Sequence, residues 1–244
     1  IPEAFITAHQ ALFWLGQLDP SQFVLIHGGA SGVGTAAIQL AKQRGATVAV
    51  TVGSAEKASA CLQLGADHVI NYVTTSDWDV AVREITGGRG VDHVIENGGG
   101  ATLLRSIKST KRGGWIHIIG LIAPGEIDPV HILLSGVTLR GKEVGSREMF
   151  AAMNRSLSHS KIRPVVDKLF AFDQLPEALG ELGAGNHFCA DVAARARLVV
   201  HNDGLAQQAG HGFGHQARAG VGIASGGIGA NPVDAFAGVL VLRP

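Results

Sequence analysis

The sequence is poor in cysteine and carries no excess of charge of either sign. Its two cysteines, Cys61 and Cys189, lack the C-x-x-C spacing of a metal ribbon and offer little for a disulfide framework, which favours a reducing, cytoplasmic setting. The 20 basic and 20 acidic side chains balance without a basic face, so nucleic acid is not expected as a partner. No apolar run approaches the roughly 20 residues that span a bilayer, so no membrane partner is expected either.

Motifs of several other protein classes are also missing. Gly-x-Ser-x-Gly does not occur, so a hydrolase would lack its nucleophile elbow. His211 and His215 stand four apart, but the glycines between them disfavour the helix that would aim both at one metal, and we predict no metal site. Residues 224–229 imitate a dinucleotide loop, yet Asn231-Pro232 interrupts any helix after it.

The last part of the chain differs from the rest in composition. No Lys or Glu follows Glu181, and Gly, Ala, Gln and His dominate from Cys189 on. Because periodicity also weakens, we expect residues 189–244 to form an atypical, poorly ordered tail. No signal peptide is visible, and Ile1 reads as the middle of a longer protein.

The stretch from Gln22 to Arg44 is the most informative part of the sequence. An apolar run, Phe23–Ile26, predicts a strand buried on both faces, and helical periodicity begins again at Val33. Between them, residues 28–34 form a glycine-rich loop. Gly29, Ser31 and Gly34 occupy the places of G-x-G-x-x-G, with serine in the middle, and Gly32 and Val33 complete the candidate loop. This order is typical of a dinucleotide-binding unit that holds a pyrophosphate at the helix start. The alternative is an ordinary strand-to-helix turn.

Strands and helices are predicted to alternate along most of the chain, which indicates an α/β fold with a doubly wound parallel sheet, a Rossmann fold. Ligands of such sheets bind at the carboxyl ends of the strands, where loops 28–34, 53–57, 97–100 and 120–124 would meet. We predict strands at 23–26, 46–52, 68–72, 91–96, 115–120, 137–142 and 165–172, and helices at 2–18, 33–44, 55–64, 77–85, 101–108, 146–158 and 175–182. Residues 1–145 would form the dinucleotide-binding domain.

The sequence resembles the medium-chain dehydrogenase/reductases. Residues 27–34 and 65–72 are similar to the zinc-free quinone oxidoreductases related to zeta-crystallin, whereas residues 86–92 and 145–149 look closer to alcohol dehydrogenase-like members. The resemblance implies an oxidoreductase whose substrate domain mostly lies outside this sequence, with residues 146–188 as a C-terminal remnant of it. Glu3 stands where zinc-dependent relatives carry a cysteine ligand, so the resemblance implies a zinc-independent protein.

The residues after the second strand bear on the choice of cofactor. The acid that binds the ribose of NAD is missing after Val52, and Glu56 lies inside the next predicted helix. Gly53, Ser54 and Lys57 could instead hold the 2′-phosphate of NADP, and the resemblance gives matching serine and lysine residues that role. It also implies that Tyr72 lies beside the adenosine end. The alternative is that Ser54 only caps a helix and Lys57 is a solvated charge. We predict NADPH as the cofactor.

The resemblance implies further contacts at the nicotinamide end of the cofactor. Thr7 matches a threonine close to the nicotinamide, and Gly120 and Leu121 match backbone groups that orient its carboxamide. Asn97 and Gly98 would contact the cofactor after the fourth strand. The alternatives are packing for Thr7 and a plain turn for residues 97–100. No catalytic residue can be named.

These features predict an NADPH-dependent oxidoreductase that transfers hydride to a small-molecule quinone or to an activated carbonyl or enone. The alternative is a truncated nucleotide-binding module without turnover. Residues Val137–Lys142 would form the last strand of the sheet, and because an uncovered edge strand tends to pair with another chain, we expect a homodimer through it. Family relatives often dimerise at this strand.

Overall fold

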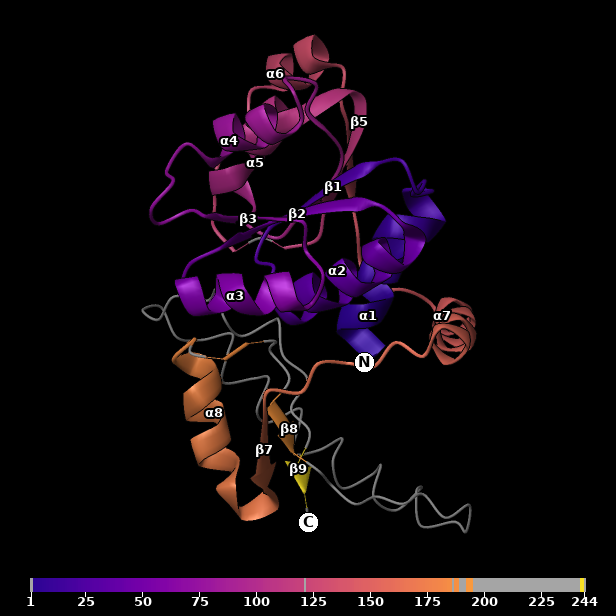
Figure 1. Ribbon diagram of the computed structural model, residues 1–244, viewed down its shortest axis with the longest axis vertical. Helices are drawn as coiled ribbons and strands as arrows, with labels where there is room; N and C mark the ends of the chain where they lie inside the picture. The colour runs from indigo at the N-terminus through magenta and orange to yellow at the C-terminus, as the bar shows by residue number, and fades with distance from the viewer. Residues whose placement is uncertain (1, 121, 186, 189–191, 195–241, 244) are drawn as a thin grey trace.

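A computed structural model describes residues 2–120, 122–185, 187–188, 192–194 and 242–243. Six strands form one sheet in which each pair is parallel, in the order β3-β2-β1-β4-β5-β6 (Figure 1). The strands are β1 (Phe23–Ile26), β2 (Thr47–Val52), β3 (His68–Asn71), β4 (Val91–Glu96), β5 (Thr110–Ile118) and β6 (Thr138–Gly141). This order is that of the Rossmann fold, with the switch point between β1 and β4, so the predicted fold is confirmed.

Helices cover both faces of the sheet (Figure 1). The helices that accompany it are α1 (Pro2–His9), a π-helix η1 (Gln10–Leu15), α2 (Gly32–Arg44), α3 (Ala55–Gln63), α4 (Trp78–Ile85), α5 (Gly100–Ser109), α6 (Pro129–Ser135) and α7 (Arg147–Ser160). One apolar cluster joins the sheet to α1, α2, α3 and α7, and a second joins it to α4, α5 and α6.

The short central strand shows why its sequence is apolar throughout. Val24 and Ile26 belong to the first cluster, whereas Leu25 points to the second, and all three side chains are fully buried. Strand β2 repeats the pattern, with Val48 and Val50 on one face and Ala49 on the other. A central strand of a doubly wound sheet has no solvated face, so alternation of polar and apolar residues is absent.

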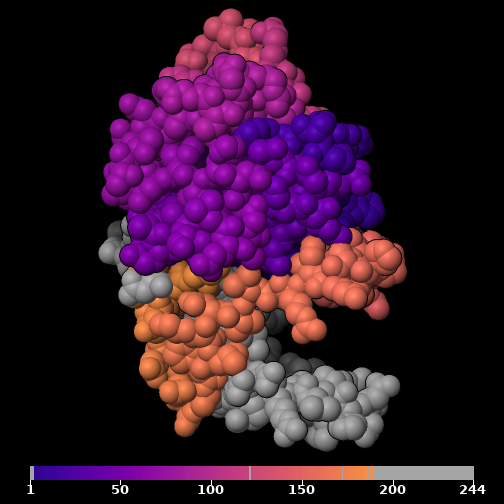
Figure 2. All heavy atoms as spheres, in the orientation of Figure 1, coloured from indigo at the N-terminus to yellow at the C-terminus, as the bar shows by residue number. Residues whose placement is uncertain are grey.

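The C-terminal part forms a separate small sheet. Strand β7 (Lys168–Ala171) pairs in parallel with β8 (Val192–Ala194) and with β9 (Leu242–Arg243), and the 3₁₀ helix η2 (Phe172–Gln174) leads into α8 (Leu175–Gly183). In the space-filling view the β7–α8 segment, in orange, lies against the sheet domain below α3 (Figure 2). Lys57 Nζ donates a hydrogen bond of 2.8 Å to the Gly185 carbonyl across this contact.

The predicted domain boundaries at 145 and 188 stay predictions. Met153 and Leu157 of α7 are buried in the same cluster as α1 and α2, so apolar packing continues past residue 145. Of the expected tail, residues 189–191, 195–241 and 244 lie outside the described residues, and with them His211, His215 and the loop at 224–229. No helix in the described ranges is long and apolar enough to cross a membrane.

Three local features differ from the sequence prediction. The first helix is α-helical only to His9 and continues as a π-helix, a change of hydrogen-bond step that apolar periodicity does not reveal. Strand β5 begins at Thr110, directly after α5, because Gly113 at φ +78° and Gly114 let the chain bend without leaving the sheet. The third, α6, was not predicted, although Asp128 caps its start and Gly136 its end in the left-handed conformation.

Candidate functional site

The glycine-rich loop joins β1 to α2 at the carboxyl edge of the sheet. Its start is fixed to both neighbouring strands, because His27 N–H donates to the Ile95 carbonyl (3.1 Å) and Gly29 N–H donates to the Thr51 carbonyl (3.0 Å). Gly28 has a φ of +60°, which turns the chain away from β1. Ser31 then caps α2, and its Oγ accepts a 3.0 Å hydrogen bond from Gly34 N–H.

Two of the fingerprint glycines have no room for a side chain. A Cβ at Gly34 would stand 2.2 Å from the Gly28 carbonyl oxygen and 2.7 Å from that of Gly29, so the first turn of α2 lies directly against the loop backbone. A Cβ at Gly29 would stand 2.7 Å from the Val50 side chain. Gly32 is buried although it belongs to the loop, because it opens a helix that is itself packed on the sheet.

The start of α2 suits an anionic group. Gly34 N–H is bonded to Ser31, but among the hydrogen bonds of the described chain the amides of Gly32 and Val33 donate to no protein acceptor. Free amides and the helix dipole favour a phosphate at this point. The residues present therefore fit the pyrophosphate of a dinucleotide.

The end of β2 brings together the residues predicted to bind the adenosine end. A Cβ at Gly53 would stand 2.5 Å from the Tyr72 hydroxyl, so glycine allows the half-exposed tyrosine ring to lie close to the backbone. Ser54 caps α3, its Oγ accepting a 3.3 Å hydrogen bond from Lys57 N–H. Glu56 is exposed, and hydrogen bonds from its own backbone N–H and from Ser54 hold the pKa of its carboxyl below the usual value. A 2′-phosphate role for Ser54 and Lys57 stays a prediction.

The ends of β4 and β5 lie against each other. The Asn97 side chain donates a 2.8 Å hydrogen bond to the His27 carbonyl, which ties the end of β4 to the end of β1. A Cβ at Gly120 would stand 2.2 Å from the Asn97 carbonyl oxygen, so only glycine fits there. Gly98 shares this edge, and Leu121 lies outside the described residues. The loops after four strands thus meet at one edge, as the sequence predicted.

A buried polar network under this edge was missed by the sequence analysis. Glu96, fully buried at the end of β4, accepts hydrogen bonds from the N–H groups of Gly98 (2.8 Å) and Gly99 (3.2 Å) and from Thr102 Oγ1 (2.6 Å). Its other oxygen accepts a short hydrogen bond from Ser106 Oγ. The carboxylate therefore sets the shape of the turn after β4.

His27 extends the same network toward β2. Its Nδ1 lies 3.0 Å from Thr51 Oγ1, and its Nε2 lies 2.9 Å from Ser106 Oγ and 3.6 Å from Glu96 Oε2. Burial lowers the pKa of His27 below its ordinary value, and the nearby Glu96 opposes this only in part. The only sign of this network in the sequence was that two polar residues, His27 and Glu96, stand at the ends of strands that were predicted to be buried.

Thr7 takes a structural position on α1. It is 4% exposed, and its hydroxyl donates a 2.7 Å hydrogen bond to the Glu3 carbonyl one turn earlier. This is the arrangement expected of a threonine that packs inside a helix bundle. A contact with the nicotinamide stays a prediction.

The described residues do not fit a zinc ion. They contain no group of three or more His, Cys, Asp or Glu side chains that could hold a metal. Glu3 is exposed at the start of α1, and burial raises the pKa of the Cys61 thiol to about 11, which disfavours the thiolate that zinc requires. The prediction of a zinc-independent protein stays untested.

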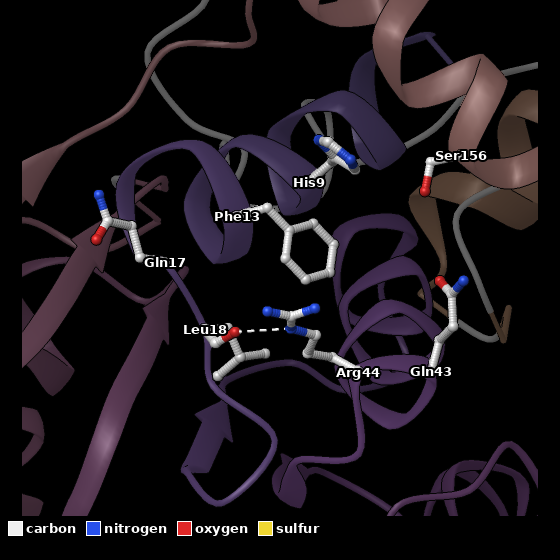
Figure 3. A pocket seen from close by; sticks show the side chains of 7 residues that line it. All are labelled: His9, Phe13, Gln17, Leu18, Gln43, Arg44 and Ser156. Carbon is white, nitrogen blue, oxygen red and sulfur yellow. Dashed lines mark hydrogen bonds between the residues drawn. The ribbon is translucent and has the colours of Figure 1, made fainter.

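Two hollows are described in the structure, and both lie at the amino edge of the sheet, away from the glycine loop. One, of about 510 Å³, lies between η1, the end of α2 and α7 (Figure 3). The other, of about 590 Å³, lies between the ends of α4, α5 and α6.

Comparison with known proteins agrees with this geometry. The model of a family described as zinc-binding dehydrogenases matches residues 32–159. A zinc-type alcohol dehydrogenase-like protein of Schizosaccharomyces pombe is 41% identical over 186 residues, which cover 73% of this chain and 54% of that protein. A 2-haloacrylate reductase of a Burkholderia species is 33% identical over 175 residues, covering 64% of this chain and 52% of that protein. The chain thus spans about half the length of the curated relatives it matches.

Solved structures show the same likeness. An NAD-dependent alcohol dehydrogenase superposes with a TM-score of 0.71 at 33% identity, over 77% of this chain and 55% of the other. A mycobacterial protein complexed with NADPH superposes with a TM-score of 0.65 at 28% identity, over 73% of this chain and 58% of the other. Both nicotinamide cofactors therefore occur among similar folds.

Proposed function

The chain belongs to the medium-chain dehydrogenase/reductase superfamily, because it matches the zinc-binding dehydrogenase family. We propose that it is an oxidoreductase that uses NADPH and that, unlike the zinc-dependent relatives, it is zinc-independent. Its substrate would be a small quinone or an activated carbonyl or enone. The observation that carries the proposal is the start of α2, where the amides of Gly32 and Val33 stand free above a loop that excludes side chains at Gly29 and Gly34.

NADPH, when bound, would supply the hydride, and the chain's own residues would hold and orient it. The amides of Gly32 and Val33 would bind the pyrophosphate. Ser54 and Lys57 would bind the 2′-phosphate beside Tyr72. The turn at Asn97–Gly98, with Gly120 and Thr7, would face the nicotinamide end, and Leu121, which lies outside the described residues, stays a predicted contact. Glu96 accepts hydrogen bonds from the N–H groups of Gly98 and Gly99, so it would support the turn on which the nicotinamide end is proposed to lie.

The preference for NADPH rests on the end of β2. The acid typical of NAD sites is missing there, since Glu56 is exposed in the first turn of α3. Lys57 already donates to the Gly185 carbonyl, and its ammonium retains two further donors for a phosphate. Lys57→Gln should weaken NADPH binding by about 1–2 kcal/mol, roughly 5- to 30-fold, and leave NADH binding unchanged. Lys108→Gln, at an exposed position on α5, is the matched control, and equal losses for both cofactors would contradict a phosphate role.

Turnover is the test of the proposal as a whole. NADPH binding would be titrated by its fluorescence, and NADPH consumption would be followed with a panel of quinones and enones. We expect binding and, with at least one substrate class, consumption. Binding without consumption would favour the second candidate, a nucleotide-binding module without turnover, which the half-length match to the relatives supports. Absence of binding would end both candidates.

We also propose that the chain forms a homodimer through β6, in the cytoplasm. Strand β6 is hydrogen-bonded only to β5 among the described strands, so its outer edge is free to pair. The preceding helix α6 exposes Leu133 (74%) and Leu134 (69%), two apolar side chains that a partner chain would cover. The location follows from the scarcity of cysteine in the sequence.

A further inference from the structure

The hollow between η1, the end of α2 and α7 carries polar groups that the proposed function does not use. It lies at the amino edge of the sheet, because its lining residues directly precede β1 and β2 or belong to α7. Figure 3 shows the Arg44 guanidinium and the Phe13 ring directed into the same space. The lining also includes the imidazole of His9, the side-chain amides of Gln17 and Gln43, and the Ser156 hydroxyl. Arg44 is the only charged residue among them, so the hollow favours an anion.

Arg44 is held in place by a single hydrogen bond. Its Nε donates to the Leu18 carbonyl at 3.0 Å (Figure 3), and its two terminal amino groups make no hydrogen bond or salt bridge in the described part of the chain. The exposed Asp19 is close enough for the Arg44 charge to contribute to lowering its pKa, but the two side chains form no ion pair within 4 Å. A fixed guanidinium with its outer fork free matches the two oxygens of a carboxylate.

His9 and Phe13 supply the rest of a binding surface. His9 is 8% exposed, and its Nδ1 has no hydrogen-bond partner among the described residues. Burial lowers the pKa of His9, so the ring is neutral at pH 7 and one of its nitrogens can donate. The Phe13 ring meets His9 edge-on at 4.9 Å between centroids and offers an apolar wall.

The backbone around the hollow is unusual at two places. His9 precedes the π-helix Gln10–Leu15 and Phe13 lies within it, and such helices are frequently found at functional sites. Gln17 has a φ of +48°, one of two positive values at non-glycine residues in the described chain. Residues in sparsely populated conformations cluster at ligand sites, because binding compensates for the strain.

We propose that this hollow binds a small aromatic carboxylate, with its carboxylate on Arg44 and its ring against Phe13. The proposal is independent of the dinucleotide site at the opposite edge of the sheet. It would add a second, separate ligand site to the chain.

The test is a calorimetric titration of the full chain with benzoate and with benzamide, which has the same ring but no charge. Saturable benzoate binding is expected, with a dissociation constant on the order of 1 mM. Benzamide should bind at least about tenfold more weakly, since it cannot form the charged pair. Equal binding of the two compounds, or displacement of benzoate by NADPH, would overturn the proposal.

Three variants locate the site. Arg44→Gln should weaken benzoate about tenfold or more, whereas Arg112→Gln, which removes another exposed arginine bonded to a backbone carbonyl, should not change it. If Arg44→Gln does not fold, Arg44→Lys serves, because it keeps the charge but loses the fork and should bind with intermediate affinity. Unchanged benzoate affinity in Arg44→Gln would refute the assignment.

Discussion

Removal of the Glu96 carboxylate should be among the most damaging single changes in the sheet domain. In Glu96→Ala the N–H groups of Gly98 and Gly99 lose their acceptor inside the protein, whereas Thr102 and Ser106 keep other partners, the Gly99 carbonyl at 3.3 Å and His27 at 2.9 Å. The Gly99 N–H is buried and the Gly98 N–H is partly buried. An orphaned buried donor costs about 1–3 kcal/mol, a partly buried one less, and the space left by the side chain adds to this. We expect a loss of about 3–5 kcal/mol in the free energy of unfolding.

Glu96→Gln should be much milder. Its amide oxygen can keep the three hydrogen bonds that Oε1 now accepts, and its amide nitrogen can donate to Ser106 Oγ. What is lost is charge assistance, worth about 1–2 kcal/mol. The measurement is urea denaturation of both variants, with Glu84→Ala on the exposed face of α4 as a control that should stay within about 0.5 kcal/mol of the wild type. A loss below about 1 kcal/mol in Glu96→Ala would mean that water satisfies the Gly98–Gly99 turn, and the rigid support proposed for the nicotinamide end would be wrong.

Three further predictions follow from the described residues. Gly34→Ala should lower the free energy of unfolding by about 1–3 kcal/mol, seen in a thermal melt, and abolish NADPH binding, because its Cβ would stand 2.2 Å from a backbone oxygen. Gly180→Ala in α8, with open space around it, should be neutral or stabilising. A native melt and native affinity in Gly34→Ala would contradict the packing role. Burial lowers the pKa of His93 to about 4 and of His117 to about 3. As the pH falls from 7 to 5, these histidines become protonated in the unfolded chain but not in the folded chain, so each should remove about 2 kcal/mol of stability. The urea midpoint of His117→Phe should therefore fall less than that of the wild type as the pH is lowered, and an equal fall would refute this. Leu134→Glu should convert a dimer to a monomer in light scattering, and a wild type that is monomeric at micromolar concentration would contradict the dimer itself.

The parts of the fold that the sequence predicted are those with local signals. The apolar run at Phe23–Ile26, the glycine spacing and the return of helical periodicity are all read within about 20 residues, and the structure has a strand, a loop and a helix there. Helix α6 also had local signals, in Asp128-Pro129 and Gly136, but it is a single short helix with no buried residues to give it a periodic pattern.

The parts that could not be predicted depend on residues that meet only in the folded chain. His27 and Glu96 are 69 positions apart and come together because β1 and β4 are neighbours at the switch point of the sheet. Asp92 is a similar case. Its carboxylate accepts a 2.8 Å hydrogen bond from Phe23 N–H and forms ion pairs with Arg89 and Lys111. The motif at residues 86–92, which resembles that of the family, therefore also holds neighbouring strands together. The contact of Lys57 with Gly185 likewise joins two segments that the sequence analysis predicted to belong to different domains.

Serine in the middle position of the fingerprint changes which hydrogen-bond donors a phosphate bound at this loop would meet. Because the Ser31 oxygen accepts the hydrogen bond of Gly34 N–H, this amide would not be available to an anion bound at the helix start. The same oxygen keeps its own hydrogen, which it can offer to a phosphate oxygen. The number of donors facing the anion is therefore conserved, although one of them has moved from the rigid backbone to a hydroxyl that rotates. A glycine at this position would return the amide and lose the hydroxyl, so the loop can exchange the two residues without changing the charge or the donor count that a dinucleotide meets.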